Sequence, residues 1–252
     1  MALFKNSYES HAHSMEVLSQ IYGYDSFLDG ITTVADMGCG EGLDVKWWAT
    51  LETRDDPPEP HNYLVYAVDK RIDLLEPDVA KLSNVIPVEG DFAEPLIPRK
   101  IDLLWAHDSF QYARDPLRCL AAWKQSMALN GMLVITLPQM TYWDHTYNKL
   151  MINQYNYQFH NYNLVNLIYM LAINGFDCRD AYFYRETNTP WLSAAVYATE
   201  HEPMPASTGW HELAEKRLIN DSFMSSINKY GYVRLEDVVV CWLDKAFYKI
   251  TD

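Results

Sequence analysis

Residues 34–42 read VADMGCGEG, a short apolar strand that runs directly into three glycines at alternate positions. Glycine has no Cβ, so the backbone can turn sharply there and approach a ligand closely. An apolar segment with helical spacing begins at Leu43. A glycine turn between a strand and a helix forms a cofactor cradle, because the first amide groups of the helix face it. The alternative is a turn whose glycines serve only the backbone.

The glycine spacing excludes two common cofactor motifs. A dinucleotide-binding turn carries glycine at its first, third and sixth positions. Counted from Gly38, the third position is Gly40 but the sixth is Leu43. A P-loop is excluded as well, because it needs a Lys-Ser or Lys-Thr pair that is absent here. Asp36 would repel a pyrophosphate and suits a cofactor that has a cationic amino group.

Composition and charge limit the class of protein. The chain has 252 residues, of which 49% are hydrophobic, enough for a packed core in one domain with an appendage. Its net charge is −14 and it has no cluster of Lys and Arg. Phosphate backbones are bound mainly through such clusters, so no nucleic-acid partner is expected. The four cysteines form no Cys-x-x-Cys pair, which indicates free thiols rather than disulfides or a zinc site.

Neither a membrane segment nor a leader is expected. No run of about 18 apolar residues occurs, so the sequence predicts no transmembrane helix. Residues 1–14 are polar and lack the apolar centre of a signal peptide. We therefore expect a cytoplasmic protein without a membrane partner.

Strand-like and helix-like segments alternate from residue 30 to residue 200, which predicts an α/β fold with a mostly parallel sheet and helices on both faces. The last two strands are expected to form an antiparallel pair. Asn130-Gly131 is expected to be the turn into the fifth strand. The seven expected strands cover 33–37, 63–68, 84–88, 101–106, 132–137, 180–186 and 191–199.

Periodicity and capping residues place the helices. After the glycine turn, Leu43, Trp47 and Leu51 fall at i, i+4 and i+8 and are expected to share one buried stripe. Another helix begins where Asp115 is the N-cap and Pro116 the first helical residue. Further helices are expected over 8–22, over 71–82 with a break at Pro77, and over 162–173 with Gly175 as the stop.

These patterns divide the chain into two parts. The first is a domain of residues 1–200, in which residues 1–29 form a helical cover on a core of residues 30–200. The second is a helical extension, residues 201–252, that packs on the core as a lid, a dimer contact or a buttress. The oligomeric state stays open, with a homodimer among the alternatives. The helices expected in the extension cover 209–228 and 235–249.

Several motifs at expected strand ends resemble one enzyme family. Ligands of open α/β sheets bind at the carboxyl ends of the strands. The pattern Asp36-x-Gly38-x-Gly40-x-Gly42 resembles motif I of the class I S-adenosylmethionine-dependent methyltransferases. IDLLWAH at 101–107 resembles motif IV. ALNGMLVI at 128–135 resembles the family's Leu-Lys-Pro-Gly-Gly turn, with departures at positions 130 and 132. The likeness covers roughly residues 30–200 and points to the type 11 small-molecule group.

The resemblance implies a Rossmann-like, doubly wound, seven-stranded sheet that binds S-adenosylmethionine and yields S-adenosylhomocysteine. Asp69 would accept hydrogen bonds from the ribose hydroxyls, and Asp91 would hold the adenine amino group with Phe92 against the ring. Taken alone, Asp69 can also be a helix N-cap and Asp91 a turn cap. The cofactor-binding residues implied by the resemblance are Asp36, Gly38, Cys39, Gly40, Asp69, Lys70, Gly90, Asp91, Phe92 and His107.

Candidates for catalysis follow strand four. His107 is the best general base, because histidine titrates near neutrality, and Asp108 is a weaker one. The alternative for His107 is that only its backbone contacts the cofactor. Asp102 lies inside the apolar strand and is interpreted as structural. His11 and His13 are interpreted as polar surface of the N-terminal helix, and no set of metal ligands stands out.

The segment after strand five is rich in aromatic residues and predicts an acceptor pocket that includes Tyr142 and His145, with ordinary packing as the alternative. The leading hypothesis is in-line transfer of a methyl group from S-adenosylmethionine to a small-molecule acceptor. One alternative is a non-catalytic relative that binds the cofactor and serves a regulatory role. Another is a methyltransferase that acts on protein or RNA.

Overall fold

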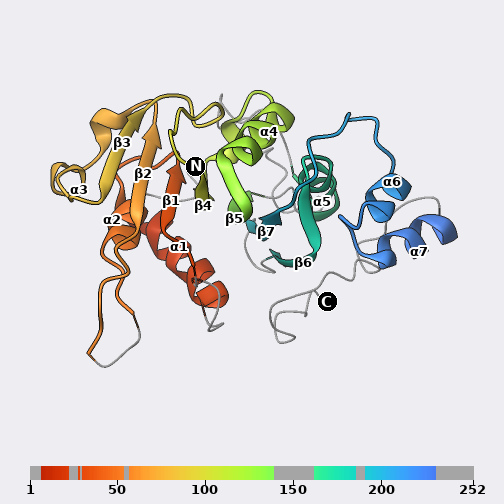
Figure 1. Cartoon of the computed structure of the whole chain (residues 1–252), viewed down its shortest axis with the longest axis horizontal. Coiled ribbons are helices and arrows are strands. Elements are labelled where there is room, and N and C mark those ends of the chain that lie inside the picture. The colour runs from red at the N-terminus through yellow and green to blue at the C-terminus, as the bar shows by residue number, and fades with distance from the viewer. Residues whose placement is uncertain are drawn as a thin grey trace, which may run out of the picture.

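A seven-stranded sheet forms the centre of the chain (Figure 1). The computed structural model describes residues 7–22, 28, 30–53, 57–138, 162–185 and 191–230. The strand order is β3-β2-β1-β4-β5-β7-β6, in which β7 runs antiparallel to β5 and β6 and the other pairs are parallel. This confirms the predicted Rossmann-like, mostly parallel sheet. The strands are β1 Thr33–Met37, β2 Leu64–Asp69, β3 Val85–Glu89, β4 Ile101–His107, β5 Met127–Pro138, β6 Phe176–Arg185 and β7 Trp191–Ala198.

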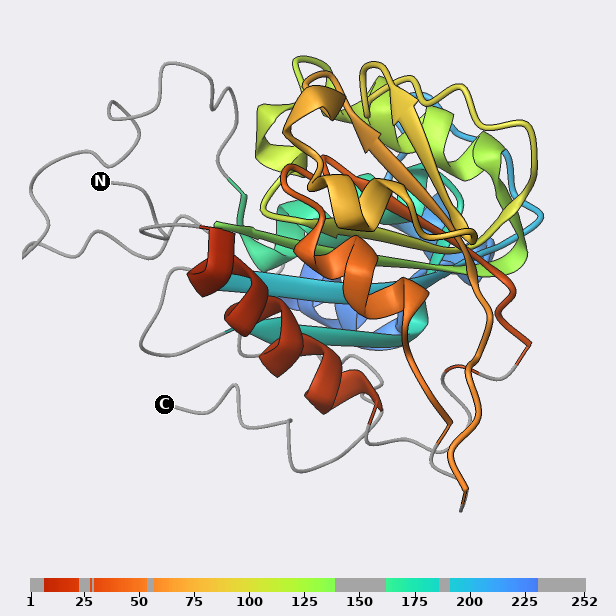
Figure 2. The ribbon, with the colours of Figure 1, turned by 90° about the vertical axis from the view of Figure 1, so that its left-hand side faces the viewer.

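Helices cover both faces of this sheet, and alternate strand residues point to each face. Figure 2 shows α1 and α2 together on one side. Val17 of α1 and Trp48 of α2 share an apolar cluster there with Trp105 of β4. Trp123 of α4 and Leu167 of α5 belong to the cluster on the opposite face. The helices are α1 Ser7–Tyr22, α2 Leu43–Ala49, α3 Pro77–Ala80, α4 Pro116–Ser126, α5 Leu164–Ile173, α6 Trp210–Glu215 and α7 Asp221–Tyr230, with single 3₁₀ turns at Ile72–Leu74 and Phe110–Tyr112.

Local capping and breaking signals were predicted correctly. The Asp115 side chain accepts a hydrogen bond from the Arg118 amide at the start of α4. Pro77 begins α3, as expected of a residue that interrupts the helix before it and starts a new one. Gly175 follows α5 with φ +79, the left-handed conformation that ends helices.

The predicted stripe on the helix after the glycine turn is wrong in part, because Trp47 and Leu51 pack against the core but are only partly buried. That helix ends at Ala49, and its buried residues are Val45 and Trp48. The Trp48 ring packs edge-on against Trp105 at a centroid distance of 5.7 Å, so the sheet surface below the helix selects the side that is buried. Tertiary packing, rather than helix propensity or residue spacing, therefore determines which face of α2 is buried.

Two other boundaries differ from the predictions. Asn130-Gly131 is not a separate turn, because β5 runs through it with a register shift against β4 and with Asn130 at φ +62. The helix expected over 209–228 is interrupted by Arg217 at φ +56, so α6 and α7 are separate. The range 235–249 lies outside the described residues, and the division of the chain at residue 200 stays a prediction.

Asp102 ties the two central strands together at their amino ends. Its Oδ2 accepts hydrogen bonds from the Thr32 amide at 2.9 Å, the Thr32 hydroxyl at 2.7 Å and the Thr33 amide at 3.0 Å. A carboxylate with three donors is a strong link between β4 and the start of β1. The structural interpretation of Asp102 is therefore confirmed.

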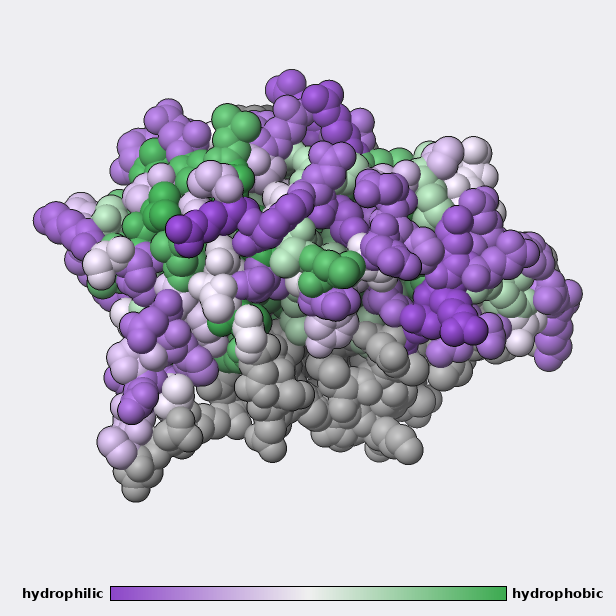
Figure 3. All heavy atoms as spheres, viewed as in Figure 1, coloured by the Kyte–Doolittle hydropathy of each residue, from purple (hydrophilic) through white to green (hydrophobic). Residues whose placement is uncertain are grey.

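Hydrophilic side chains cover much of the face shown in Figure 3, with apolar groups between them. Among the described residues, the large hydrophobic side chains that are exposed are scattered along the chain and include Leu96 and Leu129. Single exposed apolar residues of this kind are normal for a protein surface. None of the described helices is long and apolar enough to cross a membrane.

Candidate functional site

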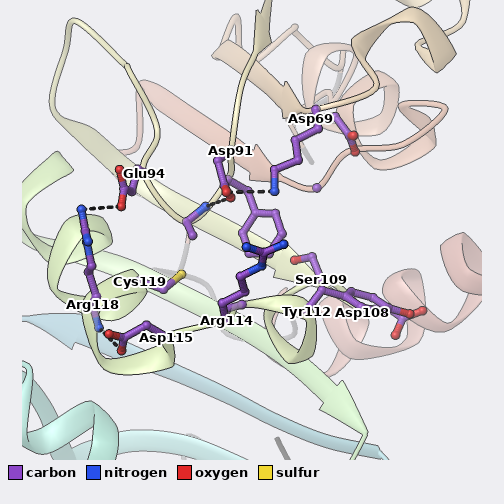
Figure 4. A pocket seen from close by; sticks show the side chains of 15 residues that line it. Asp69, Asp91, Glu94, Asp108, Ser109, Tyr112, Arg114, Asp115, Arg118 and Cys119 are labelled. Atoms are coloured by element: carbon purple, nitrogen blue, oxygen red, sulfur yellow. Dashed lines mark hydrogen bonds and ion pairs between the residues drawn. The ribbon is translucent and has the colours of Figure 1, made fainter. Parts of the chain in front are cut away.

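A cleft of about 730 Å³ opens where the parallel strands end (Figure 4). This is the position at which open α/β sheets bind ligands, and the volume falls in the range of small-molecule sites. The structure therefore brings together side chains that lie at the ends of β1, β2, β3 and β4. The predicted site residues that line the cleft are Gly38, Asp69, Lys70, Asp91, Phe92 and Asp108.

The glycine turn forms the floor of the cleft. The amides of Gly38 and Cys39 both donate to the Val68 carbonyl, at 2.8 and 3.1 Å, so the turn lies against the end of β2. Gly38 has φ +84, and a Cβ there would lie 2.7 Å from the Cβ of Ser109. Glycine is needed at this position both for the backbone conformation and for the close approach of the loop after β4.

Asp69 connects three strand ends. Its Oδ2 accepts a hydrogen bond from the Gly40 amide at 3.0 Å, and its Oδ1 accepts one from the Arg71 amide at 2.8 Å. Its carbonyl oxygen accepts from the Gly90 amide at 3.1 Å. A carboxylate has about four acceptor sites, so the Asp69 side chain can cap the turn after β2 and still accept two hydrogen bonds from a ligand.

Asp91 lies at the mouth of the cleft. Its Oδ2 is 2.9 Å from Lys70 Nζ, and its Oδ1 accepts a hydrogen bond from the Ala93 amide. Partial burial acts to raise the pKa of Asp91, but the hydrogen bonds from Lys70 and Ala93 and the charges of Lys70 and Arg114 hold that pKa below its ordinary value. The carboxylate thus caps the turn after β3 and pairs with Lys70.

The loop after β4 supplies a wall that sequence reasoning did not assign. Ser109, Tyr112 and Arg114 line the cleft opposite Asp69 and Asp91 (Figure 4). The Ser109 hydroxyl is buried and has no hydrogen-bond partner among the described residues. Its place in the segment His107-Asp108-Ser109, which follows the expected fourth strand, was the signal that could have identified it.

Asp108 faces a different direction from the other cleft carboxylates. It has φ +53, and its carboxylate points away from Arg114 in Figure 4. Gln111 Nε2 donates to its Oδ1 at 2.5 Å. Burial raises the pKa of Asp108 to about 7, against the opposing effects of the Gln111 hydrogen bond and the charge of His13.

Five predicted cofactor residues lie outside the lining of the cleft, namely Asp36, Cys39, Gly40, Gly90 and His107. Asp36 is only 4% exposed, and no described residue donates a hydrogen bond to its carboxylate. Burial, followed by the charges of Asp44 and Asp69, raises its pKa well above the ordinary value. Burial also raises the pKa of the Cys39 thiol. Gly40 and Gly90 contribute the amides that bind Asp69.

The side chain of His107 points to the α1 side of the sheet. Its Nε2 lies 2.8 Å from Nδ1 of His13, and its Nδ1 lies 3.3 Å from the Ser10 hydroxyl. The indole ring of Trp191 lies 5.0 Å from the His13 ring and 6.1 Å from the His107 ring. Both histidines are 8% exposed, so this contact is part of the interior.

Asp44 binds the same helix from α2. Its Oδ1 lies 2.5 Å from Nδ1 of His11, and its Oδ2 accepts hydrogen bonds from Ser14 and, at 2.9 Å, from Trp105 Nε1. Burial alone would raise the pKa of Asp44, but the hydrogen bond from His11, the charge of His107 and the bonds from Ser14 and Trp105 hold it below its ordinary value.

We call His11, His13, Ser14, Asp44 and His107 the α1 cluster. The interpretation as polar surface is wrong for His13, which is buried against His107 of β4. His11 is partly exposed and contacts Asp44 of α2. Their partners lie at least 33 residues away in the sequence, so no local pattern indicated the contacts.

Two further sequence predictions concern a metal site and an acceptor pocket. Among the described residues, no group of three His, Cys, Asp or Glu side chains is placed to hold a metal ion. Tyr142 and His145, predicted for an acceptor pocket, lie outside the described residues.

Comparison with known proteins identifies the fold. No protein-family model and no curated protein sequence matches the chain. Among solved structures, the chain is similar to the N-methyltransferase NodS from Bradyrhizobium japonicum WM9 in complex with S-adenosylhomocysteine, with TM-score 0.54 and 14% identity over 79% of this chain and 91% of NodS. The chain has the class I methyltransferase fold.

Other proteins with a similar fold are named for different reactions. The chain is similar to phosphoethanolamine N-methyltransferase 2 from Haemonchus contortus, with TM-score 0.55 and 13% identity over 75% of this chain and 53% of that enzyme. It is also similar to the [4+2]-cyclase SpnF, with TM-score 0.56 and 14% identity over 80% of this chain and 84% of SpnF. The class I methyltransferase fold therefore does not by itself fix the chemistry of this chain.

Proposed function

We propose that the chain binds S-adenosylmethionine in the cleft and transfers its methyl group to a small-molecule acceptor. The observation that carries this proposal is that the glycine turn, the end of β2 and the loop after β4 meet in the cleft. The Gly38 turn closes against β2, approaches Ser109 after β4, and is held by the Asp69 carboxylate through Gly40. This arrangement leaves acceptor oxygens and one unpartnered hydroxyl directed at a space that fits a small molecule.

The residues present suit the parts of this cofactor. Asp69 would accept hydrogen bonds from the two ribose hydroxyls, and Asp91 would accept one from the adenine amino group beside Phe92. Asp36 would face the cationic amino group, since its buried carboxylate has no donor from the described residues. A cation nearby would offset the burial and lower the pKa of Asp36. Lys70 would keep Asp91 in place through its ion pair.

The bound cofactor would supply an electrophilic methyl group on a sulfonium. The contribution of the chain is to hold donor and acceptor in line at contact distance, which accounts for much of the rate gain in two-substrate reactions. His107 and Asp108, at the end of β4, are the proposed groups that handle an acceptor proton.

The comparisons support this proposal without deciding it. The NodS structure holds S-adenosylhomocysteine, and the Haemonchus contortus enzyme holds S-adenosylhomocysteine with phosphomonomethylethanolamine. The [4+2]-cyclase SpnF has a similar fold, so the fold alone does not decide between methyl transfer and another activity.

Calorimetric titration with S-adenosylmethionine tests the cofactor site. We expect Asp69→Ala to weaken binding by about 100-fold, because two hydrogen bonds to a charged group are lost. The matched control is Asp78→Ala, since Asp78 is also an aspartate at the surface and pairs with Lys46 away from the cleft. Equal affinity of wild type and Asp69→Ala would show that the site is assigned wrongly.

A transfer assay separates an enzyme from a binding protein. Wild type is incubated with S-adenosylmethionine and a pool of metabolites, and release of S-adenosylhomocysteine is followed. Release that depends on an added acceptor supports methyl transfer. Tight binding of the cofactor without acceptor-dependent release across the pool favours the binding protein.

A further inference from the structure

We propose that Asp108 selects the positively charged form of the cofactor, so that the cleft binds S-adenosylmethionine more tightly than S-adenosylhomocysteine. The two molecules share the adenine, the ribose and the amino acid group, and they differ in one methyl group and in the positive charge on sulfur. This inference rests on the proposed function and adds a specificity-determining residue to it. Its consequence is that methyl transfer itself weakens the binding of the product.

The order of the strands places Asp108 beside the expected position of the sulfur. The strands β3, β2, β1 and β4 are neighbours in that order, and their carboxyl ends lead into Asp91, Asp69, the Gly38 turn and Asp108. A cofactor with its adenine at Asp91 and its ribose at Asp69 continues toward the glycine turn, because its sulfur is bonded to the ribose C5′ carbon. The sulfonium would therefore lie over the turn, between Asp69 and the loop after β4.

The loop after β4 lies directly against the glycine turn. A Cβ at Gly38 would lie 2.7 Å from the Cβ of Ser109 and 3.5 Å from its hydroxyl oxygen. The Ser109 side chain is buried, and its hydroxyl has no hydrogen-bond partner among the described residues. Gly38, Asp108 and Ser109 all line the cleft. The Asp108 carboxylate therefore belongs to the residue next to the point at which the two walls meet.

The charges at the outer end of the cleft, where the adenine is expected, are paired. Lys70 Nζ lies 2.9 Å from Oδ2 of Asp91, and a guanidinium nitrogen of Arg118 lies 2.7 Å from Oε1 of Glu94. Arg114 acts electrostatically on Asp91 as well, and its side chain points toward this end in Figure 4. A ligand at the outer end therefore meets cations and anions in near balance.

The end at the glycine turn has carboxylates that lack a paired cation. Asp69 and Asp108 form no ion pair among the described residues. Asp36, at the end of β1, is buried and receives no hydrogen bond from the part of the chain that the structure describes. A positive charge at this end would be attracted by these carboxylates and would lower their pKa values in return.

The groups that face Asp108 leave it free to act on a ligand. Gln111 Nε2 donates to its Oδ1 at 2.5 Å, and a carboxylate has about four acceptor sites. His13 of α1 acts electrostatically on Asp108 from the helix side, and burial raises the pKa of Asp108 to about 7. The carboxylate points away from Arg114 in Figure 4. Among the described residues, no Lys or Arg pairs with Asp108 and competes with a bound cation.

Methyl transfer removes the charge that Asp108 attracts. The acceptor forms a bond to the methyl carbon while the carbon–sulfur bond breaks, and the electron pair of that bond turns the sulfonium into a neutral thioether. The proposed contacts of Asp36 with the amino group and of Asp69 with the ribose are common to both forms of the cofactor. Asp108 alone of the three would thus distinguish the cofactor from its product.

Calorimetric titration with both ligands tests the inference without any acceptor. A nearby opposite charge moves the pKa of a carboxyl group by about one unit or more, and one unit corresponds to about tenfold in affinity. At pH 8, where Asp108 is ionised, we expect wild type to bind S-adenosylmethionine about 10-fold more tightly than S-adenosylhomocysteine. At pH 6, where Asp108 is mostly protonated, the ratio should fall to about twofold.

Variants and a third ligand separate charge from shape. Asp108→Asn keeps the size of the side chain, and we expect it to bring the ratio at pH 8 to within about twofold and to leave the affinity for S-adenosylhomocysteine within about threefold of wild type. The matched control is Asp115→Asn, because Asp115 also lines the cleft but caps α4; its ratio should equal that of wild type. The third ligand is the analogue in which a C–NH₃⁺ group replaces the methylsulfonium, and it should behave like S-adenosylmethionine with every variant.

The remaining outcomes decide against the inference. Equal affinity of wild type for the two natural ligands at pH 8 overturns it, and so does a ratio that Asp108→Asn and Asp115→Asn change by the same factor. A preference for S-adenosylmethionine that the amino analogue does not share would assign the effect to the methyl group and would also overturn it. Failure of wild type to bind any of the three ligands refutes the proposed function and this inference with it, whereas equal binding of all three refutes the inference alone.

Discussion

The cleft and the α1 cluster both lie at the carboxyl ends of the strands, but they are built in opposite ways. The cleft is open and is made from main-chain amides and carboxylates that belong to adjacent strand–turn units. Asp69, for example, binds the turn of the preceding unit through Gly40. The α1 cluster is buried and is made from side chains that pair across long sequence separations, as His13 does with His107. The first arrangement suits a ligand that enters from solvent, and the second holds a helix in place.

The difference has an energetic side. Exposed ion pairs such as Lys70–Asp91 contribute little to stability because water competes for both partners. Buried carboxylates with several donors contribute much more, since removal of the acceptor leaves each donor without a partner. We therefore expect substitutions in the α1 cluster to affect folding most and substitutions in the cleft to affect binding most.

The largest effect is expected for Asp44→Ala. The change leaves His11, Ser14 and Trp105 without their shared acceptor, and we expect a loss of about 4 kcal/mol in the free energy of unfolding. Urea denaturation measures it, and Asp44→Asn, which keeps one acceptor oxygen, should lose about half as much. Cofactor affinity should stay within about threefold of wild type. A loss of affinity as large as that of Asp69→Ala would show that the two regions are one site.

The second prediction concerns the pH dependence of stability at Asp108, which lies between the cleft and the α1 cluster. The folded-state pKa of Asp108, about 7, lies above its ordinary value of 3.8. Between these values the folded chain binds one proton more than the unfolded chain, so the Asp108 contribution to stability falls as pH rises through this window. The Asp108→Asn side chain does not ionise, so this variant does not lose stability in this pH window. From pH 5 to pH 8 we expect the stability of the variant to improve by about 2 kcal/mol relative to wild type.

Unfolding experiments at both pH values check this expectation. The control is Asp78→Asn. Hydrogen bonding to Lys46 lowers the pKa of Asp78, so the effect of this substitution on the free energy of unfolding should not change between pH 5 and pH 8. An unchanged difference between Asp108→Asn and wild type would mean that the Asp108 carboxylate is solvated rather than buried.

A third prediction compares three glycines of the cleft. Gly38→Ala combines a positive φ with a contact of 2.7 Å to Ser109, and we expect it to reduce the free energy of unfolding by about 2 kcal/mol. Gly40→Ala has a positive φ but open space around the added Cβ, so about 1 kcal/mol is expected. Gly90→Ala meets neither constraint and serves as the control. Chemical denaturation that gives equal losses for Gly38→Ala and Gly90→Ala would contradict the close approach.

The smallest effect is expected for Lys70→Ala. Its ion pair with Asp91 is well exposed on both sides, so we expect a change in unfolding free energy below about 0.5 kcal/mol. The measurement is again urea denaturation, at low and at high salt. A loss above 1 kcal/mol would place Lys70 in a network like that of the α1 cluster and weaken the contrast between the regions.

The same contrast explains what the sequence could predict. Asp36, Gly38, Asp69 and Asp91 each lie at or just beside the end of a strand, and strand ends are visible along the sequence. These residues, the strand pattern and the Asp115 cap reflect local rules of turns, caps and alternation. Their placement at one edge of the sheet follows from the topology of parallel strands.

The α1 cluster could not be predicted in this way. Whether a histidine on a helix faces solvent or the sheet depends on how the helix docks, and α1 precedes the first strand without a short connection that would fix its orientation. The same holds for α2, where packing of Trp48 on Trp105 replaced the stripe expected from spacing. Non-local packing therefore decides the contacts of α1 and α2 that local sequence patterns did not predict.

Asp102 has a consequence for the history of the molecule. It fastens β1 to β4 at the amino ends of the strands, at the opposite edge from every residue of the cleft and the α1 cluster. Loops at the carboxyl edge can thus change in sequence and length without allowing the central strands to slide. A sheet fixed at its amino edge can carry different catalytic loops at its carboxyl edge. In keeping with this, the structures that the chain resembles include both N-methyltransferases and a cyclase.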